Sequence, residues 1–380
     1  MECYRKELQE YIKNRKEETL NLLKDLCGIP APSHHEDERA EYIRQWLEDH
    51  GAEQVFIDEA KNVIYPYACV EGQPIALFAA HMDTVFSDLE PMPVYEQNGK
   101  LFSPGVGDDT ANLAIMLMMA AYLAEKQPAV CCGIVIAANS CEEGLGNLKG
   151  SKALVERYRD RMIQMISFDT YADRVCNKAV GSSRYKVEVL TEGGHSYEDF
   201  GHANAIKKMT EILNSLYEFV PADDGSKTTY NVGMIRGGTS VNTIAQQAEM
   251  FFEFRSDEKK DLDDANTYLE KVINEFRAKG LEIRCSLLGS RPCGSRDLRS
   301  PKQKELEEEC RQILEKWSQK KITFAAGSTD CNIPFSLGIP AATVGLILGG
   351  GAHTREEWVD ISSIPTGLGI AADIIGRLLL

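Results

Sequence analysis

Histidine and acidic residues follow several apolar segments of this sequence at spacings suited to metal chemistry. His81 ends the apolar run 75–80, and Asp83 stands two residues later. A metal-binding imidazole usually gives its second N–H group to a carboxylate, which fixes the tautomer and raises the basicity of the ring. A strand-end histidine beside a helix-capping aspartate is the commoner meaning of such a pair alone. The pair gains weight because further acidic residues and a second histidine follow downstream.

A glycine-rich turn, residues 103–107, leads to the adjacent acids Asp108 and Asp109 at the start of an apolar helical stretch. Two neighbouring carboxylates in a tight turn are costly unless a cation neutralises them. An aspartate that caps the helix is the plainer interpretation, and a dinucleotide-binding turn is another. The sequence disfavours a nucleotide, because Ala111 or Asn112 stands where the last glycine of G-x-G-x-x-G belongs.

Further positions repeat the pattern of an acid or a histidine after an apolar or glycine-rich run. Glu142 and Glu143 end one apolar run, and Asp169 ends the next. His353 follows glycines 349–351, which allow the backbone to approach a ligand closely. Each position alone is readily structural, and paired glutamates also occur in solvated loops. The combined set is His81, Asp108, Glu143, Asp169 and His353.

Two imidazoles and three carboxylates suit a pair of divalent ions with an open position for water, because no single ion needs so many anionic ligands. The ordered series of motifs resembles a known family over nearly the whole chain. It is similar to the dinuclear zinc peptidases and amidohydrolases that include peptidase T, aminoacylase and succinyl-diaminopimelate desuccinylase. The matching motifs are His81-x-Asp83, Gly107-Asp108-Asp109, Glu142-Glu143-Gly144, Asp169, Gly194-His195-Ser196, Asn242-Thr243-Ile244 and Ala352-His353-Thr354.

The resemblance implies a role for each metal ligand. Asp108 is expected to bridge two divalent ions, which are expected to be zinc, with cobalt or manganese as alternatives. His81 and Asp169 would complete one site, and Glu143 and His353 would complete the other.

The same resemblance implies the catalytic and substrate-binding residues. Asp83 would orient the first histidine ligand, and Glu142 would be the general base that takes a proton from a water bridging the two ions. His195 would help to hold the substrate carbonyl oxygen, often from the other subunit of a dimer. A turn histidine after two glycines is the alternative for His195. Asn242 and Arg255 lie where the family binds the substrate carboxylate or backbone.

Two details concern the turn that carries the bridging carboxylate. The resemblance implies a cis peptide bond between Asp108 and Asp109. The family commonly has lysine followed by glycine or alanine after the paired acids, whereas Thr110 and Ala111 follow here. The ligands themselves are untouched, so the departure concerns local charge and subfamily.

The elements that position these residues alternate between buried strands and helices, which argues for a largely parallel sheet with helices on its faces. In such sheets, sites form beyond the carboxyl ends of strands, where His81, Glu143 and Asp169 stand. The expected strands are 54–57, 63–70, 75–81, 132–138, 162–168, 322–325 and 341–348, and the expected helices are 111–125, 152–159, 301–319 and one at the C-terminal end.

The N-terminal part is expected to form two helices. The first spans about 5–27, and Ser33 is expected to cap the second, with Glu36 completing a capping box before a helix that ends at Gly51.

A change of pattern near Gly181 indicates an inserted domain. Polar and apolar residues then alternate, as in half-exposed antiparallel strands. We predict a mixed, mostly parallel α/β catalytic domain of phosphorylase/hydrolase type, 1–180 and 295–380, and an inserted α+β, ferredoxin-like lid and dimerisation domain, 181–294. The insert is expected to contain strands 184–190, 229–235, 247–254 and 281–287 and helices 204–219 and 262–279 in βαββαβ order.

Composition narrows the class of partner and the compartment. The 380 residues carry a formal charge of −16, which disfavours nucleic acid and anionic membranes as partners. The 11 cysteines are odd in number and scattered, as in a cytoplasmic protein with reduced thiols. The first residues, Met1–Lys6, are charged and lack an apolar signal region. We therefore expect a cytoplasmic protein.

The leading functional hypothesis is an aminopeptidase or a di- or tripeptidase, because relatives with aspartate at position 169 tend to be peptidases. An amidohydrolase that removes an acyl or carbamoyl group from an amino acid is the alternative. A metal-retaining binding protein without turnover is a second alternative, which the intact Glu142 argues against. The expected partners are a small peptide or N-acyl amino acid and, through the insert, a second copy of the chain.

Overall fold

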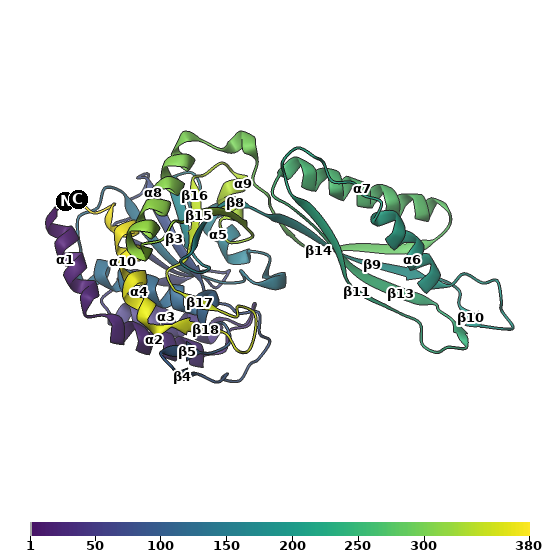
Figure 1. Ribbon diagram of the computed structural model, residues 1–380, viewed down its shortest axis with the longest axis horizontal. Helices are drawn as coiled ribbons and strands as arrows, with labels where there is room; N and C mark the ends of the chain where they lie inside the picture. The colour runs from purple at the N-terminus through teal and green to yellow at the C-terminus, as the bar shows by residue number, and fades with distance from the viewer. Residues whose placement is uncertain (1) are drawn as a thin grey trace. The chain divides into compact units, whose positions relative to one another are not determined.

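The computed structural model describes residues 2–380, with side chains from Glu7 onward, so the side chains of the charged segment Met1–Lys6 lie outside the described part. The chain forms two compact units (Figure 1). One comprises the chain up to Ala179 together with Leu298–Leu380, and the other is Val180–Asp297. The insert predicted at 181–294 lies within the second unit.

The first unit is built on a mixed, largely parallel sheet, as predicted. Within residues 2–380 the sheet has eight strands in the order β1-β2-β6-β3-β7-β16-β8-β15. β3 runs parallel to both β6 and β7, whereas β1 and β2 form an antiparallel edge. The strands are β1 Phe56–Ile57, β2 Val63–Tyr67, β3 Ile75–His81, β6 Gly133–Asn139, β7 Met162–Phe168, β8 Arg174–Ala179, β15 Thr323–Gly327 and β16 Ala341–Val344.

Side chains of β3 alternate between two apolar cores, which places helices on both faces of this sheet. Phe78 packs into a core with α2, α4 and α10, whereas Leu77 and Ala79 pack into a core with α5 and α9. β3 and β6 are therefore buried on both faces, which explains their uninterrupted apolar sequences. The helices are α1 Glu2–Lys13, α2 Lys16–Gly28, α3 Asp37–Asp49, α4 Ala111–Lys126, α5 Lys149–Tyr158, α8 Pro301–Ser318, α9 Asn332–Ser336 and α10 Ile364–Gly376.

A small antiparallel sheet in the same unit links two distant parts of the chain. Its strands run in the order β17-β18-β5-β4, and β18 pairs with β5 so that Trp358 lies opposite Phe102. The sheet was not predicted, because its strands are too short to show a hydrophobic period. The strands are β4 Tyr95–Gln97, β5 Lys100–Phe102, β17 Gly349–Gly350 and β18 Trp358–Asp360.

Several sequence-based expectations for the first unit were wrong in detail. The helix expected at 5–27 is two helices, because residues 13–18 are all polar or charged and no apolar face holds the turn between α1 and α2. Ser33 does not cap a helix. α3 starts at Asp37 with Glu36 as its N-cap, and the Ser33 hydroxyl donates to Asp83 Oδ2 instead. β8 was missed, and β16 ends at Val344.

The second unit is an antiparallel sheet covered by helices. Over Val180–Asp297 the four-stranded sheet and its helices follow the order β9-α6-β11-β13-α7-β14, and the sheet order is β11-β13-β9-β14; β10 and β12 form a separate two-stranded sheet. Val187, Met250 and Phe252 pack with α6 and α7 into one core, which places both helices on one face. The elements are β9 Gly181–Leu190, α6 Ala205–Leu216, β11 Thr228–Gly237, β13 Gln247–Ser256, α7 Lys259–Ala278 and β14 Glu282–Arg291.

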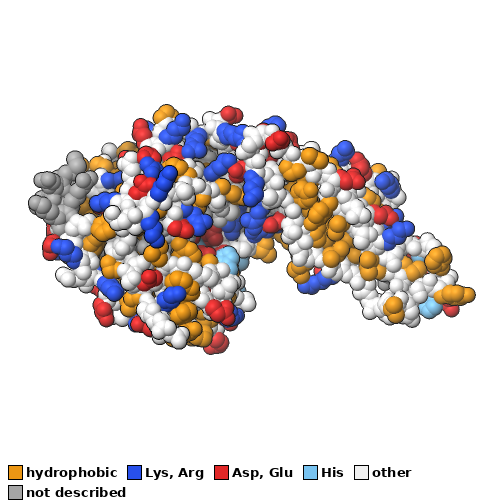
Figure 2. Space-filling view, viewed as in Figure 1, with side chains coloured by type: hydrophobic (Ala, Val, Ile, Leu, Met, Phe, Trp, Pro, Cys, Tyr) orange, Lys and Arg blue, Asp and Glu red, His pale blue; other side chains and the backbone are white. Residues whose placement is uncertain are grey.

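Charged side chains of both signs are interspersed over the visible surface (Figure 2). On β9 and β13 they form ion pairs across strands, such as Lys186 Nζ to Glu249 Oε2 at 2.9 Å. No helix in residues 2–380 combines the length and the apolar character that crossing a bilayer would require.

Candidate metal centre

The carboxyl ends of three adjacent strands carry three of the five predicted ligands. His81 is the last residue of β3, and Asp169 follows the last residue of β7. Glu142 and Glu143 follow β6 after a short turn. Because β3 lies between β6 and β7 in the sheet, these side chains meet at one edge.

The predicted ligands form two clusters that share one carboxylate. Potential ligand atoms of His81, Asp108 and Asp169 lie within 4.8 Å of one another, as do those of Asp108, Glu143 and His353. Asp108 presents Oδ1 to His81 Nε2 and Oδ2 to His353 Nε2, each at 3.1 Å. His353 Nε2 is also 3.1 Å from Glu143 Oε1. This is the arrangement expected of a carboxylate that bridges two ions.

Glu142 lies at the same place as the two clusters. Potential ligand atoms of Glu142, Glu143 and His81 also fall within 4.8 Å of one another. Both glutamates are 5% exposed. The geometry therefore brings Glu142 close to both clusters.

The buried Asp83 carboxylate holds the backbone of the paired glutamates. Its Oδ1 accepts the N–H of Glu142 at 2.9 Å, and its Oδ2 accepts the N–H of Glu143 at 3.0 Å. The Ser33 hydroxyl donates to Oδ2 at 2.6 Å. His81 Nδ1 lies 3.0 Å from the backbone carbonyl of Asp83 and 3.4 Å from Oδ1. Asp83 therefore contacts the histidine, as expected, and also orients both glutamates.

The second acid of the glycine-rich turn supports the strand. Asp109 is fully buried, and its Oδ2 accepts the N–H of His81 at 2.9 Å while Oδ1 accepts from the Asn112 amide at 2.7 Å. Burial raises the pKa of Asp109 well above its usual value. The expected cis peptide between Asp108 and Asp109 is confirmed.

Glu357 holds the glycine-rich turn and was missed by the sequence reasoning. Its carboxylate accepts the backbone N–H groups of Gly105, Gly107 and Asp108, each at 2.8 Å. Two features of the sequence could have indicated it. One is an acid four residues after His353, and the other is the glycine-rich turn 103–107, whose backbone N–H groups are accessible to an acceptor. Burial raises the pKa of Glu357 to about 7.

Charge is concentrated in this centre beyond what its imidazoles neutralise. Hydrogen bonds to Asp108 and then to Glu143 raise the pKa of His353 to about 10. Burial and then the charge of Asp108 raise the pKa of Asp169 to about 7. For Asp108, burial acts upward, but hydrogen bonds from His353 and His81 keep the pKa below its usual value. Nitrogen and carboxylate donors with surplus negative charge fit divalent ions.

The remaining predicted residues lie in the second unit. His195 belongs to β10, Gly194–His195, which pairs with β12, Thr243–Ile244, and the carbonyl of Asn242 accepts the N–H of Ser196 at 3.0 Å. Arg255 lies apart on β13, where its Nε donates to Glu253 Oε1 at 3.0 Å. The structure thus brings His195 and Asn242 together.

The His195 ring has a defined tautomer. Its Nδ1 accepts the N–H groups of Tyr197 at 3.4 Å and Glu198 at 3.3 Å. A backbone N–H can only donate, so the neutral ring carries its proton on Nε2. The exposed ring therefore offers an N–H donor.

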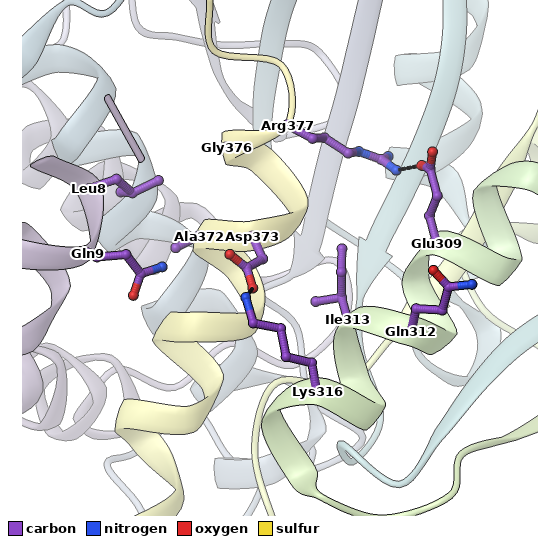
Figure 3. A pocket seen from close by; sticks show the side chains of 10 residues that line it. All are labelled: Leu8, Gln9, Glu309, Gln312, Ile313, Lys316, Ala372, Asp373, Gly376 and Arg377. Atoms are coloured by element: carbon purple, nitrogen blue, oxygen red, sulfur yellow. Dashed lines mark hydrogen bonds and ion pairs between the residues drawn. The ribbon is translucent and has the colours of Figure 1, made fainter. Parts of the chain in front are cut away.

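A hollow of about 320 Å³ in the first unit lies between α1, α8 and α10 (Figure 3). Its charged groups are already paired, since Lys316 Nζ lies 2.6 Å from Asp373 Oδ2 and Arg377 binds Glu309. Ile313 and the small residues of α10 supply an apolar floor. The described lining residues include no unpaired charged group and no nucleophile, so they give this hollow none of the catalytic groups gathered at the metal centre.

Comparisons with known proteins bear on this site. The profile of Peptidase family M20/M25/M40 matches residues 77–377. A succinyl-diaminopimelate desuccinylase of Rickettsia canadensis is 25% identical over 265 residues, covering 62% of this chain and 67% of that protein. The fold matches aminopeptidase PepT of Bacillus cereus with a TM-score of 0.72 at 20% identity, covering 96% and 98% of the two chains. The fold also matches a dinuclear metal-binding peptidase of Bacillus subtilis with a TM-score of 0.64 at 16% identity, covering 97% of this chain and 100% of that chain.

Proposed function

The chain belongs to Peptidase family M20/M25/M40, and from this we propose that it hydrolyses the amide bond of small peptides with two bound divalent ions. The family predicted by resemblance is confirmed, and so is a hydrolase acting on peptide or amide bonds, because the family is one of peptidases. We propose more narrowly an aminopeptidase that takes di- or tripeptides. The PepT likeness in fold supports this choice.

The observation that carries the proposal is the shared carboxylate of Asp108. We assign His81 and Asp169 to one ion and Glu143 and His353 to the other, with zinc as the expected metal. When bound, the two ions would acidify a water molecule and polarise the carbonyl group of the substrate.

Glu142 is the proposed general base. It would take a proton from the attacking water and give it to the leaving amine. Its backbone N–H is held by the buried Asp83, so the carboxylate is attached to a fixed point. Asp83 thereby fixes the positions of the proposed base and of the proposed ligand Glu143 relative to His81.

His195 is the proposed donor to the substrate oxygen. Its Nε2–H matches what a developing oxyanion needs, namely a preoriented hydrogen-bond donor. We propose that Asn242 and Arg255 bind the carboxylate or backbone of the substrate. In a homodimer, His195 of one chain would act in the active site of the other chain.

We propose that the inserted unit is a lid that carries the dimer contact. β11 is an edge strand that pairs with β13 alone in its sheet over Val180–Asp297, and Met234 and Ile235 on it are 42% and 48% exposed. Exposed edge strands are templates for pairing with another chain. If light scattering detects only monomer, the proposed dimer is wrong, and so is the proposal that His195 acts in the active site of the other chain.

An N-acyl amino acid amidohydrolase is the second candidate, supported by the desuccinylase relative. The deciding experiment assays tripeptides, dipeptides, N-acetyl and N-succinyl amino acids side by side on protein of measured metal content. We expect turnover of free-amine peptides with about two ions per chain, as the two ligand clusters require. Turnover of acylated substrates alone would favour the second candidate, and no metal-dependent turnover would reject both.

We also propose a cytoplasmic location. The cysteines from Cys27 onward whose side chains are described are all free thiols, which is the state kept in a reducing compartment. Cys3 lies outside the described side chains.

A further inference from the structure

We propose that Glu357 is a positioning residue that fixes the bridging carboxylate Asp108 relative to the ligand His353, by filling an anion-binding turn from within the protein. The inference rests on the proposed two-metal function. Glu357 lies outside the ligand clusters, and its proposed role is to hold in place the turn that carries one of the ligands.

The turn that receives Glu357 has the geometry of an anion site. Gly105 adopts a left-handed conformation, with φ of +76°, and the N–H groups of Gly105, Gly107 and Asp108 converge on one carboxylate. Converging backbone N–H groups of this kind bind phosphate in other proteins. Here all three donors are occupied by Glu357, which explains why a glycine-rich turn can precede a helix without serving a nucleotide.

The close fit depends on glycine. A Cβ atom at position 107 would lie 3.0 Å from Glu357 Oε1 and 2.9 Å from the ring of Tyr171. Any side chain at Gly107 would therefore push the carboxylate or the ring away. The glycine at 107 is needed for the approach of the carboxylate to the backbone.

Glu357 also ties together two segments that are far apart in the sequence. Its backbone carbonyl accepts the N–H of Ser103 at 3.2 Å, and the next residue begins β18, which pairs with β5. Figure 1 shows β5, β17 and β18 close together in the first unit, where they belong to one sheet. His353 lies four residues before Glu357, so one side chain joins the segment that carries His353 to the turn that carries Asp108.

The turn requires acceptors at both oxygens of the side chain, because Oε2 accepts the N–H of Gly105 and Oε1 accepts the N–H groups of Gly107 and Asp108. Charge-assisted hydrogen bonds are roughly twice as strong as neutral ones. Glu357→Gln keeps the size of the side chain but replaces one acceptor oxygen with an N–H₂ group that faces other donors. The neighbouring Glu356 is exposed, so Glu356→Gln removes the same charge outside the turn and is the matched control.

The test uses full-length protein stripped of metal and titrated with Zn²⁺. For Glu357→Gln we expect the affinity for the second ion, the one assigned to Glu143 and His353, to fall by about 10–100-fold. This is the usual effect of changing a residue that orients a ligand. Amide hydrogen exchange of residues 103–110 in the metal-free protein should quicken by about tenfold, the factor for one lost charge-assisted hydrogen bond. Glu356→Gln should match wild type in both.

Wild-type affinity together with wild-type exchange in Glu357→Gln would overturn the inference. If that variant does not fold, Gly107→Ala disturbs the same contact from the opposite side and should weaken the second ion in the same way, whereas unchanged affinity would again overturn it. Wild-type protein that binds no divalent ion would instead reject the proposed function. The two failures are therefore distinguishable.

Discussion

Replacing Glu142 by alanine separates the proposed base from the proposed ligands. The substitution removes a carboxylate but leaves in place every residue of the two ligand clusters that share Asp108. The backbone N–H at position 142 can still donate to Asp83 Oδ1, at 2.9 Å in the wild type, so the turn should keep its conformation. We therefore expect both ions to remain bound while turnover is lost.

The size of the loss follows from the role. A positioned general base contributes about 10²–10⁴ in rate, which corresponds to about 2.7–5.4 kcal/mol of transition-state stabilisation at about 1.36 kcal/mol per tenfold change. Folding stability should not fall by a comparable amount, because Glu142 adds negative charge to a centre that already holds a surplus. The fall should appear in kcat, since the base acts only in the chemical step.

The assay measures kcat, KM and metal content on the same preparation of Glu142→Ala. Atomic absorption should return the wild-type metal content, and kcat should drop by about 10²–10⁴. The arrangement also allows Glu142 to act as a ligand, because it lies within reach of His81 and Glu143. Loss of one ion would therefore refute the assignment, and undiminished turnover would refute any catalytic role.

The remaining predictions probe other parts of the same site. Glu143→Ala should lower metal content as well as activity, and equal metal content in variant and wild type would mean that the two glutamates are reversed. Ser33→Ala should reduce the free energy of unfolding by about 1.5–3 kcal/mol in urea titration, because it removes a donor to a buried charged carboxylate; the exposed Ser87→Ala is its control, and equal effects would contradict the role of the hydroxyl. His195→Ala should lower kcat by about 10²–10³ without loss of metal, and wild-type kcat would exclude it as the oxyanion donor.

The sequence was most informative where residues depend on local pattern. The apolar runs that become β3, β6 and β7 are fully or largely buried strands, and each ends at or near a predicted ligand. Their parallel orientation could be predicted because buried strands that alternate with helices have few stable arrangements. The insert was recognisable for the opposite reason, since half-exposed antiparallel strands show a period of two.

Sequence reasoning failed where a side chain binds a residue far away in the chain. Ser33 looked like a helix cap because Glu36 follows it at the spacing of a capping box, yet its hydroxyl binds Asp83 fifty positions later. The Glu36 carboxylate in turn accepts the backbone N–H of Cys141 at 3.1 Å. Long-range polar partners of this kind leave no periodic trace, because each contact depends on the tertiary fold rather than on neighbours in sequence.

The glycine-rich turn shows why such a motif is ambiguous until its partner is known. Gly105-Val106-Gly107 supplies accessible N–H groups, and the chemistry of those groups is the same whether the anion is a phosphate or a protein carboxylate. What decides between the two is Glu357, about 250 positions later in the chain, which occupies all three donors. With that internal anion in place, the turn is free to project Asp108 between His81 and His353. The motif is therefore best understood as the support of the Asp108 carboxylate, the proposed bridging ligand, and its missing third glycine is consistent with a turn that holds no nucleotide.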